Sequence, residues 1–140
     1  HLEISIAQIL SKIDKAIFII DCMWNIDEKI VLNNTQPFIN ALLSKKKNLK
    51  SPIIFHEQYL SNLNHPNKKL IKSIIKKNIA LKKQIDNKKN KGFKNLYLIE
   101  QDGCINEDSE ATVDGVHFND LGFERFSKHL INKLREHRLI

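Results

Sequence analysis

The stretch Ala16-Ile-Phe-Ile-Ile20 decides the fold of this chain. Five consecutive apolar residues, three of them isoleucine, are typical of a strand that is buried on both faces of a sheet. The run ends in Asp21-Cys-Met-Trp-Asn25, which we interpret as a polar loop at the carboxyl end of the strand. Two similar runs follow, Pro52-Ile-Ile-Phe55 and Asn95-Leu-Tyr-Leu-Ile99. The sequence therefore predicts three short, buried strands.

Segments with apolar residues at helical spacing surround these strands. We predict helices over Glu3–Asp14, from about Thr35-Gln-Pro37 to the lysines at 45–47, from about Pro66 to Asn90, and from Asn119 to Glu136. Proline suits a first helical turn, and asparagine is a good N-cap for the last helix. We expect the third helix to be buried on or near Leu70, Ile71, Ile74, Ile75, Ile79 and Leu81, and the last on Phe123, Phe126, Leu130 and Leu134.

The alternation of helices and strands predicts an α/β fold, with a three-layer, flavodoxin-like parallel sheet and helices on both faces. At 140 residues a single domain over 1–140 is expected. Ligands of such sheets bind at the carboxyl ends of the strands. Three polar clusters would lie there: Asp21–Asn25, His56–Tyr59, and a loop that carries Asp114 and His117.

The net charge of +7 comes from one segment. Eleven lysines and a single acid, Asp86, lie between Lys68 and Lys94, and the segment lacks arginine and interleaved aromatic residues. This pattern favours a solvated helix face over a nucleic-acid site. No run of eighteen apolar residues exists, so we expect no membrane partner. Two cysteines, Cys22 and Cys104, lack the spacing of a metal site, and we expect no metal.

The clearest chemical signal is Thr112-Val-Asp-Gly-Val-His-Phe-Asn-Asp-Leu-Gly122. Asp114 and His117 lie three residues apart around a glycine turn. A carboxylate so close can hold Nδ1–H of the ring and leave Nε2 free to take a proton from a nucleophile. The pair can thus form the orienting half of a hydrolytic triad, although an incidental histidine in a surface turn is the plainer alternative. A Cys22–His117 dyad is a further, weaker alternative.

These residues resemble the SGNH (GDSL-type) hydrolase superfamily. Asp114-Gly-Val-His117 before Asn119-Asp-Leu-Gly is similar to the family's last block, and Ile19-Ile-Asp-Cys-Met-Trp-Asn25 to its third block. Pro52-Ile-Ile-Phe resembles the next core strand, and Glu110-Ala-Thr-Val brings the pattern closest to a bacterial acetylxylan esterase branch. The resemblance implies that His117 is the general base, that Asp114 orients it, and that Asn25 donates to the oxyanion.

The resemblance also implies a serine ester hydrolase that acts on a small acyl ester, such as a carbohydrate acetyl ester, without a cofactor. The family's first block, Gly-Asp-Ser, and the glycine of its second block are missing. We therefore expect that His1 lies just downstream of the second block, that the chain is the C-terminal portion of the domain, and that it is inactive alone. Eight serines are present, none in such a setting: 5, 11, 44, 51, 61, 73, 109 and 127.

Without its first βα units, the fold would expose the edge of the Ala16–Ile20 strand. We expect the fragment to self-associate there, or an N-terminal segment to cover the edge.

Two rival functions stay open. One is a non-catalytic binding domain on the same scaffold, and the other, which rests only on the lysine helix, is a basic nucleic-acid module. The compartment is left open by the sequence.

Overall fold

The computed structural model describes residues 2–13, 17–45, 50–60, 67–106 and 108–140. Within these ranges, three strands, β1 (Phe18–Ile20), β2 (Ile53–His56) and β3 (Leu96–Ile99), pair in parallel in the order β1-β2-β3. The remaining elements are α1 (Ile4–Leu10), the 3-10 turn η1 (Met23–Asn25), α2 (Glu28–Leu42), α3 (Lys68–Asn90) and α4 (Asp120–Glu136).

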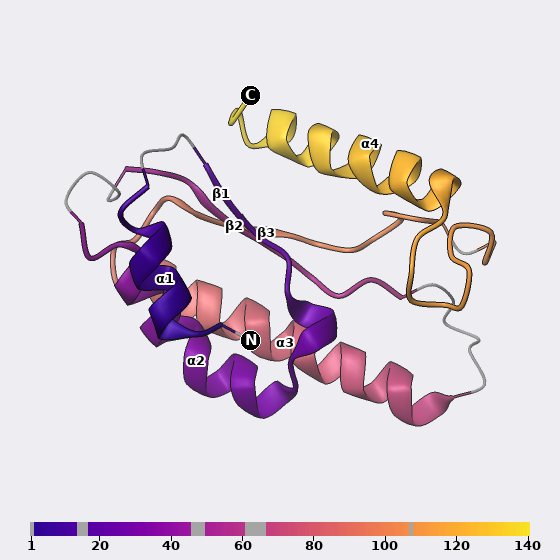
Figure 1. The fold of residues 1–140 in the computed structure, drawn as a ribbon, viewed down its shortest axis with the longest axis horizontal. Helices are drawn as coiled ribbons and strands as arrows, with labels where there is room; N and C mark the ends of the chain where they lie inside the picture. Colours follow the sequence, from indigo (N-terminus) through magenta and orange to yellow (C-terminus); the bar gives the residue numbers. More distant parts are fainter. Residues whose placement is uncertain (1, 14–16, 46–49, 61–66, 107) are drawn as a thin grey trace.

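The sheet has helices on both faces, which confirms the predicted α/β architecture. Figure 1 shows α1, α2 and α3 on one face and α4 on the other. Residues of β2 alternate between the two: Ile53 and Phe55 belong to the large core under α2 and α3, whereas Ile54 packs with Ile99 and Leu134 under α4. Because all three strands run in parallel, their carboxyl ends lie together at one end of the sheet.

The second helix begins earlier than the sequence predicts. Its N-cap is Asp27, whose carboxylate accepts a hydrogen bond from the backbone N–H of Ile30 at 2.8 Å. The predicted start at Thr35-Gln-Pro37 was wrong because Pro37 lies inside α2, where it removes one backbone donor but does not end the helix. The Asp27 cap satisfies a first-turn N–H and fixes where the chain turns into the helix.

The inner face of α3 also differs from the predicted one. Ile75 and Ile79 are exposed, with 63% of Ile79 accessible, whereas Lys77 and Asn78 are buried. Burial of a polar side chain is tolerated when it finds hydrogen-bond partners, and both of these bind loop backbone. On α4, Leu134 is buried as expected, but Phe123 is 62% exposed. None of the helices in the described ranges has the length and apolar character needed to cross a bilayer.

The loop between β3 and α4 is fastened to the start of α4. Asn119 caps the helix through the N–H of Gly122 at 3.0 Å, and its side-chain amide donates to the carbonyl of Glu110 at 2.6 Å. Gly122 lies so close to this loop that a β-carbon built on it would be 2.0 Å from the carbonyl oxygen of Ala111. The absence of a side chain at Gly122 therefore sets how closely the loop can approach the helix.

Gly122→Ala should destabilise the protein although alanine has the higher helix propensity. The added methyl group forces the loop away from α4, and we expect a loss of about 1–3 kcal/mol in the free energy of unfolding. Urea denaturation checks this, with the exposed Ser127→Ala on the same helix as the control, for which a change within about 0.5 kcal/mol is expected. Equal or greater stability in Gly122→Ala would contradict the close approach.

Candidate active site

Asp114 and His117 meet in a short turn at the carboxyl end of the sheet. Nδ1 of His117 lies 2.7 Å from Oδ2 of Asp114. The other carboxylate oxygen, Oδ1, accepts hydrogen bonds from the backbone N–H groups of Val116 at 2.9 Å and of His117 at 2.8 Å. One carboxylate thus fixes both the backbone of the turn and the ring at its end.

The electrostatics of the turn select one tautomer of the ring. The backbone N–H and the ring of His117 lower the pKa of Asp114 from its ordinary value of 3.8 to about 2, with the N–H of Val116 adding to the effect. Since the carboxylate is ionised at neutral pH, it can only accept, so Nδ1 must carry the shared proton. In the neutral ring, Nε2 is then the free base. The side chain of His117 is 76% exposed, which leaves Nε2 accessible.

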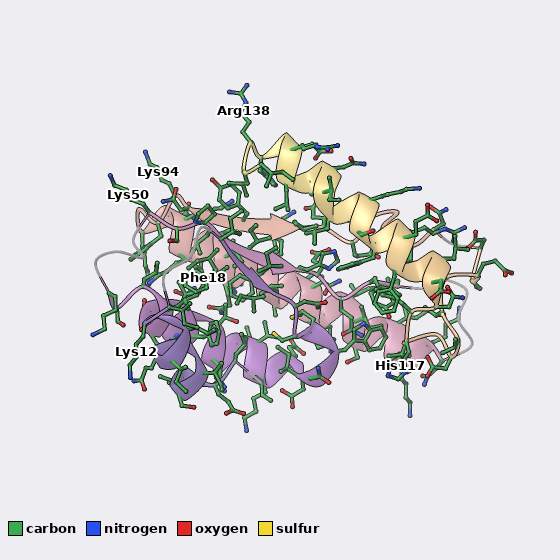
Figure 2. All side chains as sticks on the ribbon, turned by 45° about the horizontal axis from the view of Figure 1, so that its top comes forward. Lys12, Phe18, Lys50, Lys94, His117 and Arg138 are labelled. Carbon is green, nitrogen blue, oxygen red and sulfur yellow. The ribbon has the colours of Figure 1, made fainter. Side chains whose placement is uncertain are left out.

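The turn is the tip of a small hairpin that the rest of the loop supports. Thr112 and Phe118 form an antiparallel bridge, and the N–H of Val113 donates to the carbonyl of His117 at 2.9 Å. Gly115, with φ of +85°, adopts the left-handed conformation that glycine readily provides. Figure 2 shows His117 at the opposite end of the sheet from Lys50 and Lys94, which precede β2 and β3.

Tyr59 joins this turn to the loop after β2. Its hydroxyl group donates a hydrogen bond to the carbonyl of Val116. Its ring stacks on Phe118, with centroids 4.7 Å apart, and meets the edge of Trp24 at 5.2 Å. Tyr59 therefore connects three segments that are distant in the sequence: η1, its own loop, and the hairpin with Asp114 and His117.

Asn25 lies at the end of η1, next to Trp24, and its side chain is exposed. Among the described residues it forms no hydrogen bond with Asp114 or His117. The contact of Trp24 with Tyr59 brings η1 to the same end of the sheet as the hairpin. The structure thus joins Asp114 and His117 directly and places Asn25 in a neighbouring turn.

Two side chains that the sequence did not single out hold the loops beside the pair. Nζ of Lys77 donates to the carbonyls of Met23 and Ile26 around η1. The amide of Asn78 exchanges two hydrogen bonds with the backbone of Gln58, at 2.8 and 3.0 Å. A signal was available in hindsight, because Lys77 and Asn78 interrupt the apolar stripe between Ile74 and Leu81.

Other candidate groups near the strand ends are poorly suited to act as a nucleophile or a general base. Burial raises the pKa of Cys22 to about 11, so its thiol stays protonated at neutral pH and is a poor nucleophile. His56 is buried against Phe126, and desolvation lowers its pKa. None of the seven described serines lies in a tight strand-to-helix turn, and Ser61 falls outside the described residues. The part of the chain that is described contains no cluster of three or more potential metal ligands.

The family of the chain follows from comparison with known proteins. The model of the GDSL-like Lipase/Acylhydrolase family matches residues 1–135. This chain belongs to that family. A search of curated proteins gives no match.

Two solved structures share this fold. One is a protein assigned to the GDSL-like lipases from Bacteroides ovatus ATCC 8483, with 32% identity and a TM-score of 0.88. The alignment covers 96% of this chain and 40% of that one. The other is the salicylyl-acyltransferase SsfX3 from a tetracycline biosynthetic pathway, with 12% identity, a TM-score of 0.78, and coverage of 100% and 43%. The second likeness shows the fold alone. The chain spans about two fifths of the length of either protein.

The carboxyl group of Asp114 should titrate near pH 2 in the folded protein. Its pKa is depressed on folding, so the stabilisation from its contacts with the turn is present above pH 4 and disappears as the pH falls through about 2. A ¹³C NMR titration of the carboxyl carbon measures this value.

His117→Ala separates the two causes of the shift. The variant removes the ring but keeps the backbone N–H groups, so the pKa of Asp114 should rise and still remain below 3.8. The control is His137→Ala, at the exposed C-cap residue of α4, which should leave the midpoint of the Asp114 titration unchanged. A midpoint that ignores the loss of the His117 ring would exclude the hydrogen bond.

Proposed function

We propose that this chain supplies the general base, its orienting carboxylate and an oxyanion donor to a serine ester hydrolase that works through an acyl-enzyme. The observation that carries the proposal is the 2.7 Å contact between Asp114 and Nδ1 of His117, which leaves Nε2 as an accessible base. Membership of the GDSL-like lipase/acylhydrolase family supports an esterase-type activity in general.

The roles follow from the charges that develop during ester hydrolysis. Nε2 of His117 takes the proton of a serine hydroxyl as its oxygen attacks the ester carbonyl, and later gives that proton to the leaving alcohol. Asp114 remains ionised and stabilises the imidazolium. The carbonyl oxygen becomes negative in the tetrahedral intermediate, and the side-chain amide of Asn25 is the proposed donor to it. A second cycle with water in place of the alcohol releases the acid.

The nucleophile in this proposal comes from polypeptide outside the 140 residues. β1 is at one end of the strand order, and Ile19 is 47% exposed there. A groove of about 380 Å³ lies beside this strand, and the segment before α1 together with α1, β1 and α2 supplies its apolar side chains: Leu2, Ile6, Leu10, Ile19, Ile20 and Phe38. A parallel βα segment that fills the groove would end its strand level with η1, beside Asn25. The B. ovatus relative is more than twice as long, so it contains further polypeptide that can form such a segment.

The proposed substrate is a small acyl ester, and more narrowly an acetyl ester of a carbohydrate. His117 is at an exposed rim and not in an enclosed chamber, which suits an alcohol that is large and hydrophilic. The resemblance of Glu110-Ala-Thr-Val and the Asp114–His117 turn to the acetylxylan esterase branch supports the acetyl group.

The activity should depend on the nucleophile and on the pair together. The 140-residue chain should hydrolyse p-nitrophenyl acetate no faster than its His117→Ala variant. The polypeptide translated with its upstream coding sequence should be active. In that form, His117→Ala should lower kcat by about 10⁶ and Asp114→Ala by about 10⁴.

His137→Ala is the matched control in this assay, because it removes an exposed imidazole outside the hairpin. Full turnover in His117→Ala would remove this residue from the mechanism. An upstream sequence without Gly-Asp-Ser, together with no turnover on any ester, would favour the rival function of a non-catalytic binding domain.

The β1 edge should make the isolated chain self-associate. Apolar side chains along an accessible strand favour pairing with a second copy, so the molar mass from light scattering should rise with concentration. Ile19→Asp should suppress the association, whereas Ile79→Asp, at an even more exposed isoleucine on α3, should not. A strictly monomeric profile at millimolar concentration would contradict the proposed role of this edge.

A further inference from the structure

Lys77 is a lysine whose charge is directed into the protein and not toward water. It lies in the middle of α3 and is only 6% exposed. Its Nζ donates hydrogen bonds to the carbonyl of Met23 at 2.7 Å and to the carbonyl of Ile26 at 3.0 Å. Both acceptors belong to the short segment that joins β1 to α2.

Burying an ammonium group is costly, and here backbone carbonyls take the place of a counter-ion. Among the described residues, no carboxylate lies within salt-bridge distance of Lys77. Desolvation lowers its pKa, while the more distant charge of Asp27 opposes that shift. An apolar side chain at this inner position of α3 would avoid the cost. What the charged side chain adds is therefore the pair of bonds to the segment opposite.

The two bonds bracket the residues that matter for the proposed site. Trp24 and Asn25 lie between the two carbonyls, in a short 3-10 turn where the N–H of Asn25 donates to the carbonyl of Cys22 at 3.0 Å. A single 3-10 turn is weak by itself, because its hydrogen-bond geometry is poor and its carbonyls lack partners in the turn. Lys77 provides those partners from another element.

We infer that Lys77 is a positioning residue for Asn25: its ammonium group holds η1 at both ends and so fixes the amide of Asn25 where the oxyanion forms. The inference rests on the proposed function, in which Asn25 is the oxyanion donor. A donor of this kind is effective only when it is already aimed at the developing charge, so that no reorganisation is needed during the reaction. Lys77 contributes that orientation without touching the substrate.

Trp24 makes the effect measurable without any assay of activity. It is the only tryptophan in the sequence, it lies within η1, and its ring packs on Tyr59. Lys77→Met keeps the length and apolar stem of the side chain and removes both hydrogen bonds. We expect a shifted Trp24 emission maximum and a displaced NMR resonance for the side-chain amide of Asn25. Lys77→Arg, which can still donate to two carbonyls, should largely restore both signals.

Lys88 offers a matched control on the same helix. It is also buried, but its Nζ binds Asn40 and lies 4.0 Å from the centre of the Phe93 ring, away from η1. Lys88→Met should leave Trp24 and Asn25 unchanged even if it lowers the melting temperature. If Lys77→Met does not fold, Lys77→Gln, which keeps a neutral donor, is measured in its place. It should still displace the Trp24 and Asn25 signals from their wild-type positions.

In the polypeptide that includes the nucleophile, Lys77→Met should lower kcat by about 10- to 100-fold with little change in KM, since it weakens one oxyanion donor. Native signals from both Trp24 and Asn25 in a folded Lys77→Met protein would overturn the inference. Displaced signals with unchanged kcat would support the clamp on η1 and would instead remove Asn25 from the proposed function.

Discussion

Parallel pairing of β2 with both of its neighbours is the constraint on which the rest of the structure depends. The register aligns Ile20 with Phe55 on one side and His56 with Ile99 on the other, so the three strands end almost level. The segments that follow them, η1, the loop to Tyr59 and the long loop to α4, must all leave the sheet at the same end. The contact between residues as distant as Trp24 and Tyr59 is a consequence of that alignment.

Side chains bound to loop backbone convert this proximity into a fixed arrangement. Lys77 holds η1, Asn78 holds Gln58, and Tyr59 holds the carbonyl of Val116. Each bond gives a loop carbonyl a hydrogen-bond partner from another segment of the chain. The first two come from adjacent positions of α3, so one helix sets the positions of two loops. The Asp114–His117 turn is the most self-sufficient of the three, because its own carboxylate accepts two of its backbone N–H groups.

The sequence predicted what depends on short-range patterns and missed what depends on tertiary partners. The three apolar runs gave the strands, and a separation of three residues was enough to expect the contact between Asp114 and His117. The Asn119 cap was likewise local and correct. Pro37 misled because the stronger cap at Asp27 lies upstream. Lys77 and Asn78 do interrupt the apolar stripe of α3, but only the fold reveals that their side chains bind η1 and Gln58. How near Asn25 comes to the pair depends on packing across some ninety residues, which no local pattern encodes.

The distribution of apolar side chains links the sheet edge to the site. On α1, Ile6 and Ile9 are exposed, as is Ile19 on β1, while Ala7 of the same helix is fully buried. Several large aliphatic side chains that face outward around one strand form the kind of surface that a protein covers with further chain. A covering strand that pairs in parallel with β1 would run toward Asp21 and Cys22, which line the same groove, and would end beside η1. The turn that Lys77 holds is therefore also the place where such a strand would deliver its last residues. The proposed role of Lys77 and the proposed covering segment both require η1 to keep one position. Lys77 of α3 holds it from one side, and the covering segment would contact it from the other.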